Sequence, residues 1–119
     1  MEIRKENYYP FLLSIPPDSI DSQGPSPLLV FLHGRSLSGE DLNLVKKYGV
    51  LHEMEKKGRF VPGYVIGPQV KIGESWNPDK ILDLINFMIR NYNIDSNRVY
   101  VAGMSLGGYG TLHFAGKYP

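Results

Sequence analysis

The sequence contains no cysteine, and its apolar runs are short. Without cysteine the chain has no disulfide framework, no thiolate nucleophile and no thiolate metal site. No apolar run approaches the roughly 20 residues that a transmembrane helix needs, and the charged residues 1–6 lack the apolar core of a signal peptide. The sequence therefore predicts neither a disulfide scaffold nor a membrane span, and it leaves the cellular location open.

An excess of one charge is also lacking. The 119 residues include 13 basic and 12 acidic side chains, which gives a formal net charge of +1 with both signs scattered. Neither nucleic acid nor an anionic membrane surface is an expected partner. The histidines and acids are not at metal-ligand spacing, so no metal site is predicted. With 42% hydrophobic residues, the composition is that of one globular domain over residues 1–119.

Apolar strand-like runs alternate with helical patterns along the chain. We expect strands at residues 8–15, 28–32, 64–67 and 98–103, helices at 38–57, 78–90 and 106–117, a loop at 16–27 and a turn at 91–97. The unbroken apolar run at 28–32 is typical of a strand that is buried on both faces. Alternation of this kind predicts an α/β fold, a three-layer αβα sandwich around a mostly parallel sheet.

Local signals refine this pattern. Pro10 places the first strand at a sheet edge, because proline has no N–H to donate to a neighbour. Ser38 is expected to cap the first helix, and Gly49 is a weak point or break inside it. Asn77 followed by Pro78 is a typical helix start.

The chemistry is concentrated in residues 99–110, where the pattern G-x-S-x-G lies between an expected strand and an expected helix. Gly103 and Gly107 leave room for a turn so tight that Ser105 is strained and its hydroxyl is exposed. The helix behind it points N–H groups at any oxyanion that forms there. The alternative is a glycine-rich turn with an ordinary solvated serine. Because His33 and Gly34 also follow a strand, they are expected at the same sheet edge as Ser105.

In these features the sequence resembles the α/β-hydrolases, in particular the carboxylesterase, feruloyl-esterase and predicted-peptidase branches. The segments that carry the resemblance are Leu28–Gly34, Gly67–Gln69, Trp76 and Asn93–Gly110. The match runs over nearly the whole chain but covers only the first half of that family's fold. The fold expected from the resemblance is thus a partial, N-terminal half of an α/β-hydrolase.

The resemblance implies acyl transfer through a serine acyl-enzyme. Ser105 would attack an ester or amide carbonyl of a small-molecule substrate, without a cofactor. The backbone N–H groups of Leu106 and Arg35 would hold the oxyanion, with Ser36 as the alternative to Arg35.

A pocket beside the serine is also implied by the resemblance. Its expected residues are His33, Gly34, Gln69, Trp76 and Met104. Trp76 has two interpretations: it lines an acyl pocket, or it staples its loop to the next helix.

In this family the serine is followed by an acid and then by a histidine, but the chain continues for only fourteen residues after Ser105. We therefore expect residues 1–119 to be the first half of a hydrolase domain, inactive without the missing acid and histidine. His113 is about 12 Å further along the helix, and it and His52 are interpreted as ordinary helix residues. His33 is the remaining candidate base, although the family's histidine at this place shapes the oxyanion loop.

Three carboxylates, those of Glu74, Asp79 and Asp83, flank the expected site, and Asp79 is interpreted as favouring a helix dipole. In the family's sheet order, the strand that precedes Ser105 is central. Without its further neighbours it would be an exposed edge, which favours pairing with another chain. The sequence thus predicts a homo-oligomer or a missing C-terminal half. The competing hypotheses are a non-catalytic dimerising or binding module and an acyltransferase, which uses the same acyl-enzyme.

Overall fold

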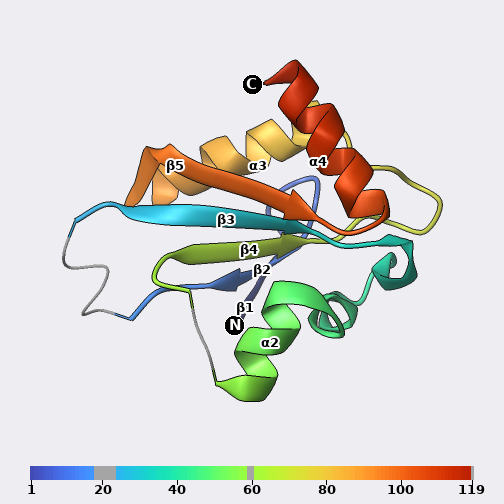
Figure 1. The fold of residues 1–119 in the computed structure, drawn as a ribbon, viewed down its shortest axis with the longest axis horizontal. Helices are drawn as coiled ribbons and strands as arrows, with labels where there is room; N and C mark the ends of the chain where they lie inside the picture. Colours follow the sequence, from blue (N-terminus) through green and yellow to red (C-terminus); the bar gives the residue numbers. More distant parts are fainter. Residues whose placement is uncertain (18–23, 59–60, 119) are drawn as a thin grey trace.

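The computed structural model describes residues 1–17, 24–58 and 61–118. A five-stranded sheet in the order β1-β2-β4-β3-β5 lies between helices α3 and α4 on one face and α2 on the other (Figure 1). The elements in chain order are β1 (Glu2–Arg4), β2 (Phe11–Ser14), β3 (Ser26–Leu32), η1 (Arg35–Leu37), η2 (Leu42–Lys46), α2 (Gly49–Lys57), β4 (Tyr64–Pro68), α3 (Pro78–Asn91), β5 (Ile94–Gly103) and α4 (Leu106–Lys117), where η marks a short 3-10 helix. This αβα architecture confirms the predicted fold class.

Strand β3 is the middle of the parallel part of the sheet, because it pairs in parallel with both β4 and β5. The buried strands supply side chains to both faces. In β2, for example, Phe11 and Leu13 join the core under α3, whereas Leu12 joins the core under α2. This alternation follows from the two-residue period of a strand. It explains why the buried strands β2, β3 and β4 are mainly apolar on both faces.

The prediction that Pro10 marks an edge strand is wrong. Strand β2 begins at Phe11, one residue after the proline, and pairs antiparallel with both β1 and β4. The edge strand on this side of the sheet is β1. Its sequence of one isoleucine between two charged residues gave no strand signal. Residues 18–23 of the expected loop at 16–27 lie outside the described residues, and its last two residues begin β3.

The expected turn at residues 91–97 is only partly correct, since β5 begins at Ile94. The ladder joins Ser26 to Ile94 and then Leu28 to Val99, so β5 carries extra residues that form a bulge. Within the bulge, the Asp95 carboxylate accepts the N–H two residues later at 2.9 Å. The polar residues therefore do make a local turn, but the chain stays in the sheet.

The single helix expected at 38–57 is wrong, because one 3-10 helix, η2, and the shorter helix α2 take its place. Ser38 does not cap a helix, and its buried hydroxyl has no partner among the described residues. Asp41 caps η2 instead, since its carboxylate accepts a backbone N–H. The break at Gly49 is confirmed: this residue has φ +79° and packs so closely on Phe31 that a Cβ would lie 2.4 Å from the ring.

The start of α3 is as predicted. The Asn77 side chain accepts the N–H groups of Asp79 at 2.9 Å and Lys80 at 3.4 Å, and Pro78 opens the helix. This satisfies two of the donors that every helix leaves free at its first turn. The buried face of α3 then packs on the sheet through Ile81, Leu84, Ile85 and Met88.

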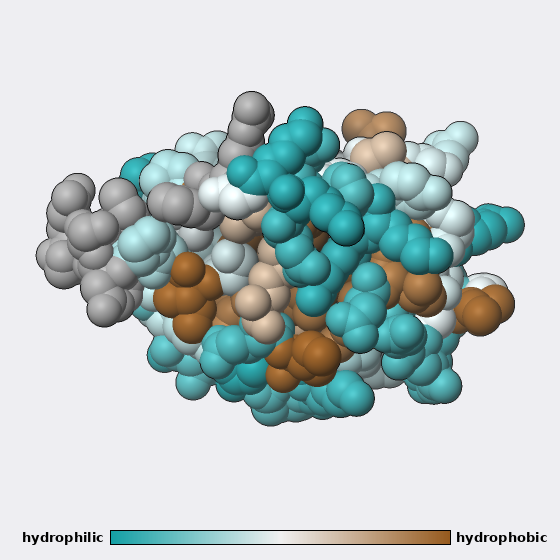
Figure 2. Space-filling model, turned by 90° about the horizontal axis from the view of Figure 1, so that it is seen from below, coloured by the Kyte–Doolittle hydropathy of each residue, from teal (hydrophilic) through white to brown (hydrophobic). Residues whose placement is uncertain are grey.

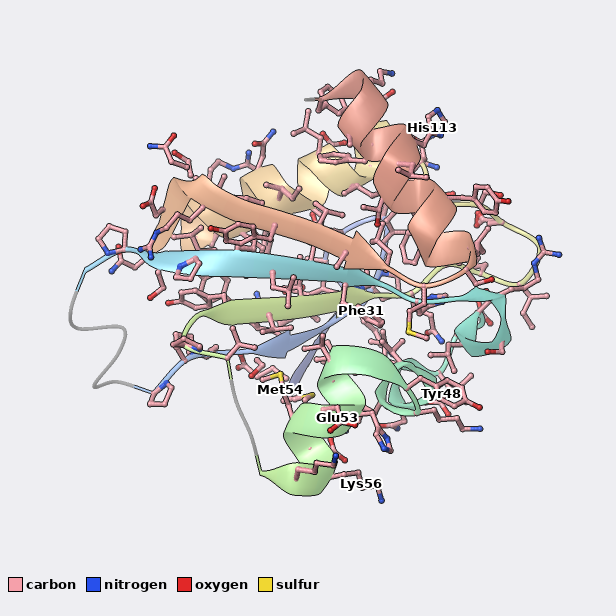
Figure 3. All side chains as sticks on the ribbon, viewed as in Figure 1. Phe31, Tyr48, Glu53, Met54, Lys56 and His113 are labelled. Atoms are coloured by element: carbon pink, nitrogen blue, oxygen red, sulfur yellow. The ribbon has the colours of Figure 1, made fainter. Side chains whose placement is uncertain are left out.

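The outer face of the α2 layer is mainly hydrophilic, with separate hydrophobic patches (Figure 2). In Figure 3, Glu53 and Lys56 of α2 point away from the sheet, whereas Met54 points toward it. This is the pattern of an amphipathic helix on a sheet. Within the described residues, no helix combines the length and the apolar character needed to cross a membrane.

The contact of Gly49 with Phe31 gives a prediction about stability. Gly49→Ala is expected to lower the free energy of unfolding by about 2–4 kcal/mol, because it adds left-handed backbone strain and a steric overlap. Gly58→Ala is the matched control: Gly58 has φ +64°, but apart from its chain neighbours no described residue has an atom within 4 Å of an added Cβ. Its expected loss is about 1 kcal/mol, from strain alone. Urea unfolding of both variants measures the difference, and equal losses would contradict the steric argument.

Candidate active site

Ser105 lies at the junction of β5 and α4 in an unusual backbone conformation. Its φ is 54° and its ψ is −115°, and among the described residues it is the one non-glycine residue with a positive φ. A serine in this region of conformational space is strained by about 1–3 kcal/mol. The side chain is exposed and makes no capping bond to its own helix. Ser105 is therefore an exposed residue in a strained turn, without a capping bond to α4.

The glycines around Ser105 are there because of close backbone contacts. A Cβ on Gly107 would lie 1.7 Å from the carbonyl oxygen of Leu32, and one on Gly103 would lie 2.2 Å from that of Gly107. Neither position accepts a larger residue without moving the backbone. The first turn of α4 thus lies directly on the end of β3.

The end of β3 and the serine turn meet, as expected for neighbouring parallel strands. The Met104 N–H donates to the Leu32 carbonyl at 3.3 Å. A Cβ on Gly34 would lie 3.3 Å from the Met104 carbonyl oxygen and 3.5 Å from the Ser105 Cβ. The loop that follows β3 therefore runs beside the serine.

Two helices begin at this junction. Arg35 is the first residue of η1, and Leu106 is the first residue of α4. The first N–H groups of a helix have no carbonyl partner within it, so both are available to a ligand. The N–H of Ser36 is in the same position one residue later. Arg35 and Leu106 thus begin two helical segments at this junction, and their role as oxyanion donors stays a prediction.

A cavity of about 390 Å³ opens beside Ser105. Three of the five expected pocket residues, His33, Gly34 and Met104, are in its wall, and so are Arg35 and Ser105. The other lining residues are Phe31, Ser36, Leu37 and Tyr48. Phe31 and Tyr48 lie on the α2 side of the sheet (Figure 3). Neither residue was predicted to line the pocket. Tyr48 was expected inside the helix at 38–57, whereas it directly precedes α2. The expected break at Gly49 was the sequence signal that could have placed Tyr48 in a loop.

His33 is completely buried and holds the loop through both of its ring nitrogens. Nε2 accepts the Val70 N–H at 3.1 Å, so the proton is on Nδ1, which donates to the Gly34 carbonyl at 2.6 Å. Burial lowers the pKa of His33 below its ordinary value of 6.5, although the bond to Gly34 opposes this shift. The ring is therefore neutral, and neither nitrogen is free to take a proton from Ser105.

Trp76 does not line the cavity beside Ser105. It holds its loop as a staple, but against the end of β3 and against α4 and not against the next helix as expected. Its indole N–H donates to the His33 carbonyl at 3.2 Å, and its ring packs edge-on against that of His33. A Cβ on Gly110 would lie 2.8 Å from the Trp76 side chain. The tryptophan thus joins the loop before α3 to α4 and to the end of β3.

Gln69 also lies outside the cavity beside Ser105. Its buried side-chain amide donates to the carbonyls of Leu37 at 2.8 Å and Asp41 at 2.9 Å. Gln69 therefore supports the loop between η1 and η2 from behind. It lines a different cavity, on the other side of that loop.

The other histidines and acids are engaged elsewhere or distant. His52 bonds the Lys46 carbonyl, and His113 lies on α4, on the opposite side of the sheet from α2 (Figure 3). Asp79 pairs with Lys117, which lowers the pKa of the carboxyl group, and Glu74 accepts a bond from Tyr8. No group of three or more metal-ligating side chains occurs in the part of the chain that the structure describes.

Comparison with known proteins identifies the fold. No protein-family model matches the chain, and no curated protein does. Among solved structures, a thermostable esterase matches with a TM-score of 0.76 and 32% sequence identity over 92% of this chain. The match covers 34% of the esterase, so this chain spans about a third of the length of that protein. The likeness shows an α/β fold similar to that of an esterase and consistent with a partial α/β-hydrolase fold.

The neutral state of His33 predicts a pH dependence of stability. In the unfolded chain its pKa returns to about 6.5, so below that pH the unfolded state binds a proton that the folded state does not. The free energy of unfolding should therefore fall as the pH drops from about 7.5 to 5, by at most about 1.4 kcal/mol per pH unit from this group. Urea unfolding at several pH values measures it. His113→Gln should keep this slope and His33→Gln should lose part of it; identical slopes would contradict the assignment.

Proposed function

We propose that this chain carries the nucleophile and the oxyanion-binding half of a serine hydrolase that acts on carboxylic esters. The observation that carries the proposal is the backbone of Ser105, with φ 54° and ψ −115°, at an exposed turn between β5 and α4. Strain of this kind persists only where the surrounding structure enforces it, and it is typical of functional sites. The likeness to a thermostable esterase supports the same reaction class.

In this proposal Ser105 Oγ attacks the ester carbonyl, and the alcohol leaves from the tetrahedral intermediate. The N–H groups of Leu106 and Arg35 stabilise the oxyanion, with the positive end of the α4 dipole behind them. Each such donor contributes about 10²–10³ in rate in other hydrolases. Phe31, Leu37 and Tyr48 give the adjacent cavity an apolar wall suited to an acyl chain.

No histidine of the described residues is placed to act as the general base of this reaction. His33 uses both ring nitrogens to hold the backbone, and His52 and His113 belong to other surfaces. We therefore propose that the acid and the histidine come from another polypeptide segment, either later in a longer chain or in a second copy. The same acyl-enzyme can pass its acyl group to water or to another alcohol or amine.

The free edge of β5 is where such a segment would attach. Among the described residues β5 pairs with β3 alone, and Tyr100 on it is 56% exposed. An open edge of this length is a template for pairing with another strand. The same edge favours the second candidate function, a non-catalytic module that associates through β5.

Acylation of Ser105 tests the proposed nucleophile. With p-nitrophenyl acetate, we expect slow acetylation of Ser105 with little turnover, because backbone donors alone retain about 10³-fold catalysis over water. Mass mapping of the modified peptide identifies the site. Ser105→Ala should remove this modification, and Ser75→Ala, a change at an exposed serine outside the Ser105 cavity, should not. Equal acetylation patterns in the wild type and in Ser105→Ala would contradict the proposal.

Association through β5 has its own test. The 119-residue chain alone is expected to form a dimer whose population rises with concentration in analytical ultracentrifugation. Tyr100→Lys should weaken it at least tenfold, since a charge at an edge opposes pairing. Tyr109→Lys, at an exposed position on α4, is the matched control. A monomer at every concentration would contradict edge pairing.

A further inference from the structure

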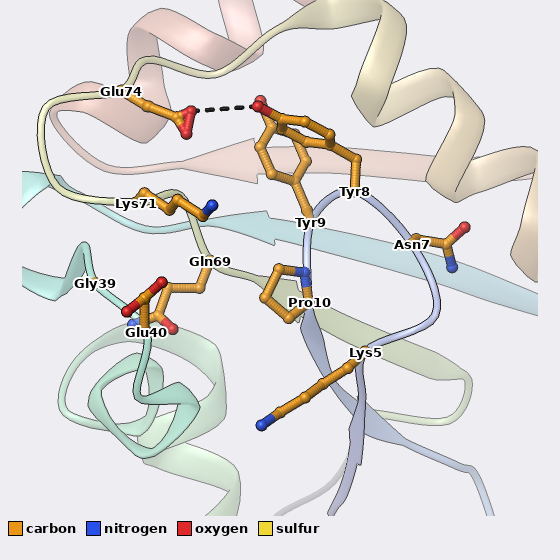
Figure 4. A pocket seen from close by; sticks show the side chains of 10 residues that line it. All are labelled: Lys5, Asn7, Tyr8, Tyr9, Pro10, Gly39, Glu40, Gln69, Lys71 and Glu74. Atoms are coloured by element: carbon orange, nitrogen blue, oxygen red, sulfur yellow. Dashed lines mark hydrogen bonds between the residues drawn. The ribbon is translucent and has the colours of Figure 1, made fainter.

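A second cavity, of about 270 Å³, lies on the other side of the loop between η1 and η2 (Figure 4). It shares no lining residue with the cavity beside Ser105. Three segments form its walls: the turn between β1 and β2, the loop before η2, and the loop after β4. The lining residues are Lys5, Asn7, Tyr8, Tyr9, Pro10, Gly39, Glu40, Gln69, Lys71 and Glu74.

These walls are held together by Gln69 and its neighbour, so the cavity is preformed. The Gln69 N–H donates to the Pro10 carbonyl at 2.9 Å, and the Gly39 N–H donates to the Val70 carbonyl at 2.9 Å. Both side-chain donors of Gln69 are used on the loop between η1 and η2. A cavity with fixed walls binds a ligand without the loss of entropy that ordering its loops would require.

Two buried side-chain atoms of residues that line this cavity lack a hydrogen-bond partner among the described residues: Gln69 Oε1 and Asn7 Nδ2, and the Asn7 amide points away from Gln69 in Figure 4. Gln69 is 1% exposed, and its Oε1 accepts no hydrogen bond among the described residues. A buried acceptor without a donor destabilises the folded state, because it loses its hydrogen bonds to water without replacement. Because both acceptors of its amide N–H₂ are backbone carbonyls, the oxygen cannot be exchanged with the nitrogen to remove this cost. A ligand that donates a hydrogen bond to Gln69 Oε1 would therefore be stabilised in this cavity.

Charges of both signs surround the same space without pairing. Lys5, Lys71 and Glu40 take part in no ion pair among the described residues, unlike several charged residues elsewhere on the surface. In Figure 4 the Lys71 ammonium points inward, between Glu74 and Gln69, and the Glu40 carboxylate lies beside the Gln69 amide. Glu74 is engaged by Tyr8 at 3.4 Å. Two cations and one anion without an ion pair, Lys5, Lys71 and Glu40, thus line one small cavity.

An apolar wall completes it. The buried ring of Tyr9 and the ring of Pro10 line the cavity, and the Tyr9 hydroxyl is held by the Asn77 N–H at 2.8 Å. The Tyr8 ring is covered by Lys80, whose ammonium lies 3.3 Å from the ring centroid. Tyr9 and Pro10 are therefore the surface that remains for a nonpolar group.

From these groups we propose that the cavity binds a small zwitterion of the α-amino-acid class. The ammonium of the ligand donates to Gln69 Oε1 and faces the Glu40 carboxylate. The carboxylate pairs with Lys71, and an apolar side chain packs on Tyr9 and Pro10. Hydrogen bonds between charged groups are stronger than neutral ones, so each charged end contributes to affinity. The site does not depend on the proposed hydrolase reaction, since it uses none of the residues beside Ser105.

Three probes of one shape test the two charged ends separately: L-phenylalanine, phenethylamine and 3-phenylpropanoate. Isothermal titration calorimetry on the 119-residue chain should show L-phenylalanine binding at least about tenfold more tightly than either analogue, because each analogue lacks one of the two charged contacts. Equal affinity for all three, or no binding of L-phenylalanine at millimolar concentration, would overturn the proposal.

Variants place the binding in this cavity. Lys71→Gln and Glu40→Gln should each weaken L-phenylalanine binding about tenfold or more, and Lys71→Arg should retain it. Lys56→Gln is the matched control, since Lys56 points outward from α2 (Figure 3). Ser105→Ala should bind L-phenylalanine unchanged even though it loses acylation, which separates this result from the test of the hydrolase proposal. Binding that survives both Lys71→Gln and Glu40→Gln would overturn the assigned site.

Discussion

The close packing of α4 on the end of β3 is the constraint on which the rest of the structure depends. Gly107 lies so near the Leu32 carbonyl that a Cβ would be 1.7 Å from it. For the chain to leave β5 and enter α4 in this space, Ser105 takes a positive φ. The same contact brings the start of α4 beside the loop after β3. The exposed serine and the free N–H groups of two helices thus follow from one backbone contact.

His33 connects three segments near Ser105 by hydrogen bonds of its ring and of its backbone carbonyl. Its ring accepts the N–H of Val70, two residues after β4, its carbonyl accepts the Trp76 indole N–H, and its own loop carries Arg35. Gln69 continues this network on the other side of the same loop. The network fixes the segments that line both cavities. It also explains why a histidine at the expected sheet edge is a support for the site and not a free base.

Sequence patterns foresaw the parts that depend on local chemistry. The cap at Asn77, the break at Gly49 and the strained serine turn are each defined by residues adjacent in the chain. The errors arose where distant contacts decide. Gly49 packs against Phe31 where one helix was expected, and the chain forms η2 and α2 instead. Pairing with β2 gave the charged residues of β1 a place in the sheet. The wall residues Phe31 and Tyr48 depended on those contacts and were missed.

By itself, the sequence determined the αβα class, the order of the main elements and the place of Ser105 at the end of a strand, because hydrophobic period and glycine spacing are local properties. Only the tertiary structure decided which side chains meet. In the folded chain both ring nitrogens of His33 bond the backbone. Gln69 and Trp76 lie outside the cavity beside Ser105. Charged residues without an ion pair, from three segments, line the cavity that contains Gln69. These outcomes depend on contacts between residues far apart in the chain, which no local pattern encodes.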